Sequence, residues 1–281
     1  MQKNDDSVLG PYRVLDLADE KGLLCGKILG DLGADVIKVE KPGGDAARNI
    51  GPFYHDEVDP EKSLYWFALN TSKRGITLDI EKPAGRELFK KLVKTADFVI
   101  ESFTPGYMDN LGLGYKDLEK LNPKVIMVSI SPYGQTGPYS KYKTSDIVSW
   151  AAGGNMFPYG DADRSPVHFS HHSQVYMNAG CDAAQGALTA LYYRHETGEG
   201  QQVDVSCQDS VMQCTEHITA SWDLGGHNAK RVPPGTKPGE RLTQIWPCKD
   251  GHVSWFYWAG NMSLRTNVPM VKWMESEGEA D

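Results

Sequence analysis

The chain has 281 residues, of which 40% are hydrophobic and 23% charged, and its formal net charge is -8. That composition suits a folded protein with one large domain, or one domain plus part of another. The acidic balance argues against nucleic acid or a lipid surface as the partner. No apolar run approaches the ~18 residues of a membrane span and the first residues do not resemble a secretory leader, so we expect a cytoplasmic protein.

The cysteine and histidine patterns predict no metal centre and no disulfide framework. The five cysteines are odd in number and form no C-x-x-C pair, so we expect buried thiols. His168, His171 and His172 form an H-x-x-H-H loop, which lacks the fixed geometry of a metal site. The cysteines are Cys25, Cys181, Cys207, Cys214 and Cys248.

The stretch from Tyr12 to Asp45 predicts one β-α-β unit. Two short apolar runs, 14–17 and 36–40, read as strands, and the second stops at the breaker run 42–44. Between them, four glycines recur at helical spacing and strip one helix face of side chains. Either the helix packs tightly on a sheet, or a ligand binds at its start. The G-x-G-x-x-G fingerprint is absent, so a nicotinamide or flavin site is not supported. The glycines are Gly22, Gly26, Gly30 and Gly33.

Further strands and helices alternate along the next 180 residues. This alternation predicts an α/β fold with a Rossmann-like, mostly parallel sheet covered by helices on both faces. The glycine- and proline-rich loop 131–139 follows one strand directly, at the sheet edge where ligands bind in such folds. We expect strands at 76–79, 98–103, 125–130 and 203–206, and helices at 82–95, 117–122, 147–154, 174–195 and 207–221.

The composition of the chain changes at Leu224, after which glycine and proline are frequent. We predict a large domain over 1–223, a glycine- and proline-rich linker over 224–244, and the start of a smaller α+β domain over 245–281. A hairpin over 245–258 opens this incomplete domain, with a turn at Lys249-Asp250-Gly251. Too little chain remains to cover its aromatic residues, which indicates an interface. These residues are Trp246, Trp255, Phe256 and Trp258.

Several phrases, taken together, resemble the class III CoA-transferases, a family that includes formyl-CoA transferase, carnitine CoA-transferase and the 2-methylacyl-CoA racemases. In order from Val14 to Trp255 they are VLDL, LGADVIKVEKPGGD, NTSKRGITLDI, VIESFTPG, SISPYGQTGPY, YYRHETGEGQQVDVS and WPCKDGHVSW. The resemblance implies a Rossmann-like CoA-binding domain, a smaller domain, and two chains linked like rings in an interlocked dimer. Family chains are longer than this one, because they return from the small domain to complete the large one.

The resemblance also implies a CoA site. CoA or acyl-CoA would be a substrate here, with no permanently bound cofactor, and a carboxylic acid would be the second substrate. Lysine and arginine suit the phosphates of CoA, since they donate charge-assisted hydrogen bonds. The alternative for each is a solvated surface charge. The family usually has an arginine where Thr104 stands. The residues carried over as CoA contacts are Arg48, Lys73, Arg74 and Lys143, with Gly134 and Gln135 in the loop 131–139.

The chain departs from the family at the catalytic position. The family's nucleophile is an aspartate whose carboxylate attacks the thioester. Counting back without gaps from Glu196-Thr197-Gly198 places Tyr176 there, and Asp182 is the fallback acid. A phenol with an ordinary pKa of ~10 is a poor substitute for a carboxylate. The racemase branch also needs a histidine beside the position of Asp146, where this chain has Ser145.

Three hypotheses follow. The chain could be an active CoA-transferase with a displaced acid, or a CoA-binding or regulatory protein without transfer chemistry. We favour a third, in which it is the subunit without the nucleophile and its homologous partner carries the aspartate, similar to the two-subunit benzylsuccinate CoA-transferases. The reason is that this chain has the family motifs that contribute CoA contacts but lacks the aspartate nucleophile.

Overall fold

The computed structural model describes residues 7–160, 163–168, 173–226, 228, 230–231, 245–255 and 260–279. Contacts within it divide the chain into two compact units, with boundaries after Met156, Val167 and Gly225. The first unit contains a six-stranded sheet and most of the helices, and the second contains a hairpin and a C-terminal helix. The predicted domain boundaries stay a prediction: a large domain over 1–223, a linker over 224–244 and a smaller domain over 245–281.

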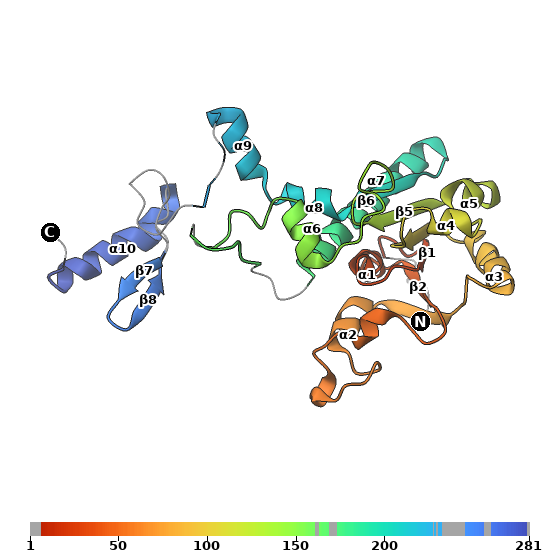
Figure 1. The fold of residues 1–281 in the computed structure, drawn as a ribbon, viewed down its shortest axis with the longest axis horizontal. Coiled ribbons are helices and arrows are strands. Elements are labelled where there is room, and N and C mark those ends of the chain that lie inside the picture. Colours follow the sequence, from red (N-terminus) through yellow and green to blue (C-terminus); the bar gives the residue numbers. More distant parts are fainter. Residues whose placement is uncertain are drawn as a thin grey trace. The chain divides into compact units, whose positions relative to one another are not determined.

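The sheet of the first unit is entirely parallel, with the strand order β3-β2-β1-β4-β5-β6 (Figure 1). This confirms the predicted α/β class, and the order is that of the Rossmann fold. The strands are β1 (Arg13–Asp16), β2 (Asp35–Glu40), β3 (Lys73–Thr77), β4 (Phe98–Glu101), β5 (Ile126–Ser131) and β6 (Gln202–Ser206).

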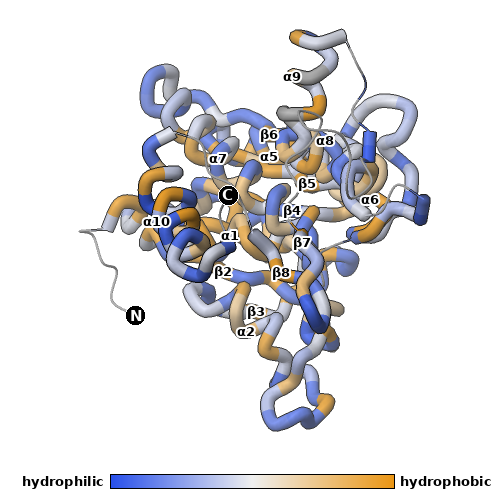
Figure 2. The backbone as a smooth tube through the Cα atoms, turned by 90° about the vertical axis from the view of Figure 1, so that its left-hand side faces the viewer, coloured by the Kyte–Doolittle hydropathy of each residue, from blue (hydrophilic) through white to orange (hydrophobic). Residues whose placement is uncertain are grey.

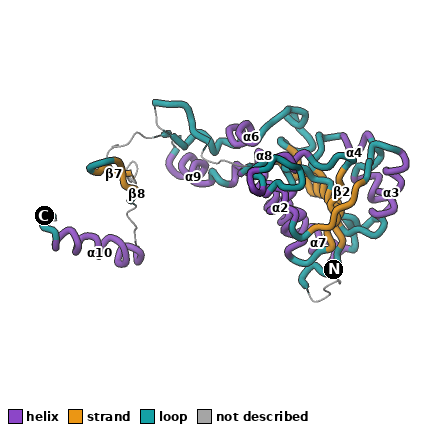
Figure 3. Tube along the Cα trace, turned by 90° about the horizontal axis from the view of Figure 1, so that it is seen from below, coloured by secondary structure: helices purple, strands orange, loops and turns teal. Residues whose placement is uncertain are grey.

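Helices cover both faces of the sheet, and purple helices flank the orange strands in Figure 3. In β5, Ile126, Val128 and Ile130 join the core under α1 and α7, while Met127 joins the core under α3 and α5. Figure 2 shows hydrophobic stretches of this unit, in orange, around β6, α5 and α7. The helices of this unit are α1 (Leu23–Asp31), α2 (Leu64–Asn70), α3 (Pro83–Val93), α4 (Tyr107–Asn110), α5 (Tyr115–Leu121), α6 (Asp146–Ala152), α7 (Gln174–Thr197), α8 (Cys207–Gln213) and α9 (Glu216–Gly225), with short 3-10 turns η1 (Ala46–Asn49) and η2 (Tyr54–Asp56).

The glycine face of α1 packs against the protein itself. A Cβ on Gly26 would lie 2.2 Å from Oδ2 of Asp16 in β1, and one on Gly30 would lie 2.9 Å from the Ser72 carbonyl oxygen. A Cβ on Gly180 of α7 would lie 2.8 Å from the Leu24 Cβ in α1. The tight-packing interpretation of this helix is therefore confirmed.

Two of the predicted elements have different bounds, and α2 and α4 were not predicted. The strand expected at 76–79 spans Lys73–Thr77, because these residues pair in parallel with β2 from Val36 to Glu40. The helix expected over 207–221 is two helices, since the Thr215 hydroxyl donates to the Met212 carbonyl oxygen at 2.7 Å where the chain breaks. Side-chain bonds of this kind compete with helical hydrogen bonds.

The second unit contains β7 (Ile245–Cys248) paired antiparallel with β8 (Gly251–Ser254), which confirms the hairpin, followed by η3 (Gly260–Met262) and α10 (Ser263–Ser276). The Trp246 indole donates to the Trp255 carbonyl oxygen at 3.3 Å, and both residues are partly buried, so the hairpin covers part of their surface. Phe256, Trp258 and most of the predicted linker lie outside the described residues.

The prediction of five buried thiols holds for Cys25 and Cys207 only, since Cys181, Cys214 and Cys248 are exposed. They lie on outward-facing positions of α7, the α8 end and β7, which cysteine spacing alone does not reveal. In the described part of the chain, no helix is both long and apolar enough to cross a membrane.

Candidate functional site

The strand order reverses between β1 and β4, and the loops after these strands diverge at that point. In open α/β sheets this switch point at the carboxyl edge is where ligands bind. The Asp19 amide donates to Ser102 Oγ at 2.8 Å, and Ser102 Oγ donates to Asp19 Oδ1 at 2.7 Å. Lys21 pairs with the same aspartate. The two loops are therefore fixed to each other by a polar network.

The amino end of α7 is held by Asp146 of α6. The residue before α7, Ser173, provides no side-chain cap. Instead the Val175 amide donates to Asp146 Oδ1 at 3.0 Å, and the Tyr176 amide donates to the same carboxylate. His168 Nε2 lies 3.2 Å from Asp146 Oδ2. Burial raises the pKa of Asp146, although these amides and His168 favour its charged form.

Tyr176 lies in the first turn of α7, and only 4% of its surface is exposed. Burial raises the pKa of its phenol well above the ordinary value, and the negative charges of Glu20, Asp146 and Asp19 raise it further. The phenol is therefore protonated at neutral pH. Burial also raises the pKa of the nearby Cys207 thiol, to about 12. Neither group is a ready nucleophile in this structure.

Four of the predicted CoA contacts follow strands at the carboxyl edge. Arg48 follows β2 and binds the Glu40 carboxylate at 2.7 and 2.8 Å, with its guanidinium 4.2 Å from the Trp66 ring centre. The other three lie in the segment after β5. The Gln135 amide donates to Asp204 at 2.9 Å, Gly134 is buried with φ of +80°, and Lys143 is exposed.

The other two predicted contacts lie elsewhere. The Lys73 ammonium is 1% exposed and lies 2.7 Å from Asp16 Oδ2, and burial lowers its pKa against the attraction of that carboxylate. Arg74 Nε donates to Asp35 Oδ1 at 3.0 Å, at the start of β2 and so at the amino edge of the sheet. The structure does not bring either residue together with Lys143.

A cavity of 370 Å³ lies at the carboxyl ends of β1 to β4. Its lysines, Lys41 and Lys82, are not among the residues that the sequence analysis selected. Their positions in the sequence could have identified them, because Lys41 directly follows the expected strand 36–40 and Lys82 lies three residues after the expected strand 76–79. Apolar residues Leu17, Val39, Leu78, Ile80 and Phe103 form part of the wall, together with Asp19, Glu40, Asp45, Asp79, Glu81 and Tyr107.

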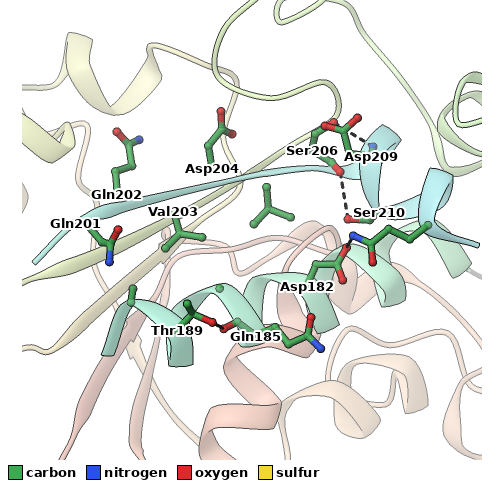
Figure 4. Close-up of a pocket in the computed structure, with 14 residues that line it drawn as sticks. Asp182, Gln185, Thr189, Gln201, Gln202, Val203, Asp204, Ser206, Asp209 and Ser210 are labelled. Carbon is green, nitrogen blue, oxygen red and sulfur yellow. Dashed lines mark hydrogen bonds between the residues drawn. The ribbon is translucent and has the colours of Figure 1, made fainter. Parts of the chain in front are cut away.

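Asp182, the fallback acid, faces a different groove. This groove of 570 Å³ lies along β6 between α7 and α8 (Figure 4). There Asp182 Oδ2 accepts a hydrogen bond from Gln213 Nε2 at 3.2 Å. It lies six positions after Tyr176, so the two side chains point to different faces of the helix. The Asp182 side chain thus points into this groove and not toward the switch point.

The described residues contain no group of three or more His, Cys, Asp or Glu side chains that could hold a metal ion. His168 is paired with Asp146, whereas His171 and His172 lie outside the described residues.

Comparison with known proteins gives a consistent result. The sequence profile described as CoA-transferase family III matches residues 9–263. The chain is 37% identical over 268 residues to the BbsE subunit of succinyl-CoA:(R)-benzylsuccinate CoA-transferase from Thauera aromatica, covering 95% of this chain and 64% of the relative. It is 34% identical to human succinyl-CoA:glutarate CoA-transferase, covering 89% of this chain and 57% of the relative. The chain thus spans roughly three fifths of these curated relatives.

Solved structures show the same fold. The crystal structure of a CAIB/BAIF family protein from Brucella suis superposes with a TM-score of 0.82 at 33% sequence identity. The match covers 99% of this chain and 71% of the Brucella protein. The chain therefore shares the fold of this protein.

Proposed function

The chain belongs to CoA-transferase family III, and on that premise we propose that it is the subunit without a catalytic aspartate in a heteromeric CoA-transferase. The complex would move CoA between an acyl-CoA and a carboxylic acid, and a homologous subunit would supply the nucleophile. The similarity to the BbsE subunit of a benzylsuccinate CoA-transferase supports this assembly. The single observation that carries the proposal is the buried, protonated Tyr176 at the counted nucleophile position.

The chemistry explains why tyrosine cannot replace the aspartate. Exchange of CoA between two carboxylates proceeds through an anhydride, which a carboxylate nucleophile forms by attacking the thioester carbonyl and releasing CoA thiolate. That thiolate then attacks the aspartyl carbonyl of the anhydride, which breaks its bond to the bridging oxygen, releases the donor acid as a carboxylate and leaves an enzyme-bound aspartyl-CoA thioester. A phenol would give an aryl ester instead, from which no carboxyl-bound CoA thioester can form.

CoA would bind at the carboxyl edge of the sheet. The cavity of 370 Å³ combines apolar walls with Lys41 and with Lys82, whose Nζ also lies 3.4 Å from Asp79 Oδ2, and Lys143 lies in the segment after β5 at the same edge. Lysine ammonium groups favour phosphate oxygens. Arg48 would fix the loop after β2, since Glu40 already occupies its guanidinium. Lys73 and Arg74 would support the fold instead of contacting CoA.

The test is to incubate the native complex and the isolated chain with an acyl-CoA and to trap the intermediate with hydroxylamine. Mass spectrometry then locates the modified carboxyl group. We expect modification only on an aspartate of the partner subunit and none on this chain. Modification of an acid of this chain would instead support the homomeric alternative, and Asp146, beside Tyr176, is the first position to inspect.

A separate measurement tests CoA binding. Calorimetry on the native complex should detect CoA, and Lys41→Ala with Lys143→Ala should weaken binding to this subunit. Lys116→Ala is the matched control, because Lys116 lies on α5, outside the cavity. Unchanged affinity in the double variant would remove the proposed CoA site and leave a purely structural subunit.

A further inference from the structure

Three tyrosines gather in the segment between β5 and α6. The ring centres of Tyr139 and Tyr142 are 5.2 Å apart with planes inclined by 37°. Tyr133 packs edge-on against both, at 6.2 Å and 6.4 Å. Tyr139 is 51% exposed and Tyr142 is 60% exposed, whereas Tyr133 is partly buried beneath them. The segment therefore presents two exposed tyrosine rings packed on a third, and exposed aromatic surface of this kind marks a candidate binding site.

Local hydrogen bonds fix this surface. The Tyr142 amide donates to the Tyr139 carbonyl oxygen at 2.8 Å, which closes a turn that sets the two rings side by side. Ser140 Oγ donates to the Gly137 carbonyl oxygen at 3.0 Å in the same turn. The Tyr133 ring at the base limits movement of both outer rings. A ligand would therefore meet rings that are already ordered, which lowers the entropic cost of binding.

The charged residues of the segment itself are all positive, although Asp204 of β6 accepts the Gln135 amide at its base. The segment 132–145 contains Lys141 and Lys143 and no acidic residue, in a chain with a net charge of -8. Both lysines are exposed, and neither forms an ion pair with any residue that the structure describes. The segment follows the carboxyl end of β5, at the ligand-binding edge of the sheet.

We propose that Tyr133, Tyr139 and Tyr142, with Lys141 and Lys143, form a binding site for a flat aromatic ring that carries an anionic group. A ring inserted between Tyr139 and Tyr142 would need centres about 7 Å apart, twice the contact distance of carbon atoms. Their separation of 5.2 Å is too small, so the ligand stacks on the outer face of Tyr142 while a lysine binds the anion.

Two sources supply this chemistry, and both rest on the proposed function. One is the adenine ring of CoA with its phosphates. The other is the aryl ring of a carboxylic acid that accepts CoA. Adenosine 3',5'-bisphosphate represents the first source and phenylacetate the second. Cyclohexylacetate is the control for phenylacetate, because it keeps the carboxylate and the ring size but has no aromatic face.

The experiment is calorimetric titration of the native complex with these three compounds. Stacking of a base on an aromatic side chain is lost on substitution by alanine, so Tyr142→Ala should weaken binding of the recognised compound about tenfold. Tyr142→Phe keeps the ring and should retain affinity. Tyr192→Ala is the matched control, because Tyr192 is a 71% exposed tyrosine of α7 outside this cluster.

The outcome assigns the source or overturns the site. Loss of nucleotide affinity in Tyr142→Ala assigns the adenine, and loss of phenylacetate affinity with weak cyclohexylacetate binding assigns the aryl acid. Equal affinities of wild type and Tyr142→Ala for both aromatic compounds would overturn the site, and so would equal binding of phenylacetate and cyclohexylacetate without nucleotide binding. Full CoA is titrated separately, so CoA binding to the native complex, combined with affinities for both aromatic compounds that Tyr142→Ala leaves unchanged, would overturn this site and leave the proposed function standing.

Discussion

At the scale of single residues, neighbouring lysine and arginine residues have different roles. Lys73 and Arg74 appear equivalent in the sequence, as two cations in one basic run. The structure buries the first against Asp16, which is fully buried, and leaves the second exposed beside Asp35. A buried charge left without its partner costs far more free energy than an exposed one.

We therefore expect Lys73→Ala to lower the free energy of unfolding by about 3–5 kcal/mol, because Asp16 loses its closest cation. Arg74→Ala should lower it by no more than about 1 kcal/mol, as for a solvent-exposed pair. Urea denaturation of both variants measures the difference. Equal losses would show that Asp16 obtains enough compensation from Lys38, whose Nζ lies 3.9 Å from Asp16 Oδ1.

Glu101 provides a second prediction at this scale. It is 4% exposed at the end of β4, and burial raises its pKa to about 7 even though the Phe103 amide donates to it at 2.8 Å. The folded state binds this proton more tightly than the unfolded state. Its stabilising contribution is therefore present below the unfolded pKa of 4.5 and is lost as pH rises toward 7.

The measurement is the free energy of unfolding of wild type and Glu101→Gln at several pH values. Between pH 4.5 and 7, wild type should lose up to roughly 3 kcal/mol relative to the variant, from 1.36 kcal/mol for each pKa unit. Glu87→Gln, on the exposed face of α3, should follow wild type. Parallel curves for wild type and Glu101→Gln would contradict the raised pKa.

At the scale of elements, the glycines of α1 lie where this helix packs closely against the sheet. Alanine in place of a helical glycine normally stabilises by about 1 kcal/mol. A Cβ at Gly26 would lie 2.2 Å from Asp16 Oδ2 and 3.2 Å from the Lys73 Cε, both in a buried ion pair. We expect Gly26→Ala to destabilise by at least about 2 kcal/mol, since overpacking costs 1–3 kcal/mol and here also displaces a charge.

Gly75 of β3 is the control for this prediction, because a Cβ there has no atom within 4 Å. Gly75→Ala should leave the denaturation midpoint unchanged or raise it slightly. A stabilising effect of Gly26→Ala would mean that α1 moves away from β1 at little cost.

Local patterns predicted most elements but not the contacts between them. The period of apolar residues identified α3, a run of small residues identified α7, and short β-branched apolar runs identified the strands. In the sequence, the residues near Lys73 gave no sign that its ammonium is buried, because its partner Asp16 is 57 positions earlier in the chain. The cap of α7 by Asp146 was hidden for the same reason: the acceptor comes from another helix. Counting along the sequence identified Tyr176 at the nucleophile position, whereas only the folded structure shows that it is buried.

At the scale of the whole molecule, each unit exposes apolar surface of its own. In the first unit, Trp222 and Leu224 of α9 are 56% and 90% exposed. In the second, Leu264, Val268 and Val271 recur at helical spacing on α10 and are 65%, 41% and 45% exposed. A helix face of this kind normally packs against another element. The proposed interlocked dimer or heterodimer would bury it.

We accordingly expect the native protein to sediment as an assembly of at least two chains, well above the 31.1 kDa of this sequence. Replacing Leu264 and Val268 by serine should weaken assembly, because both changes remove apolar area from the stripe on α10. Lys272→Ser, an exposed α10 position that carries a charge, should not. Sedimentation velocity over a range of concentrations compares the three proteins. A compact wild-type monomer that stays soluble at high concentration would contradict the assembly, since its apolar helix face would then be stable in water without any partner.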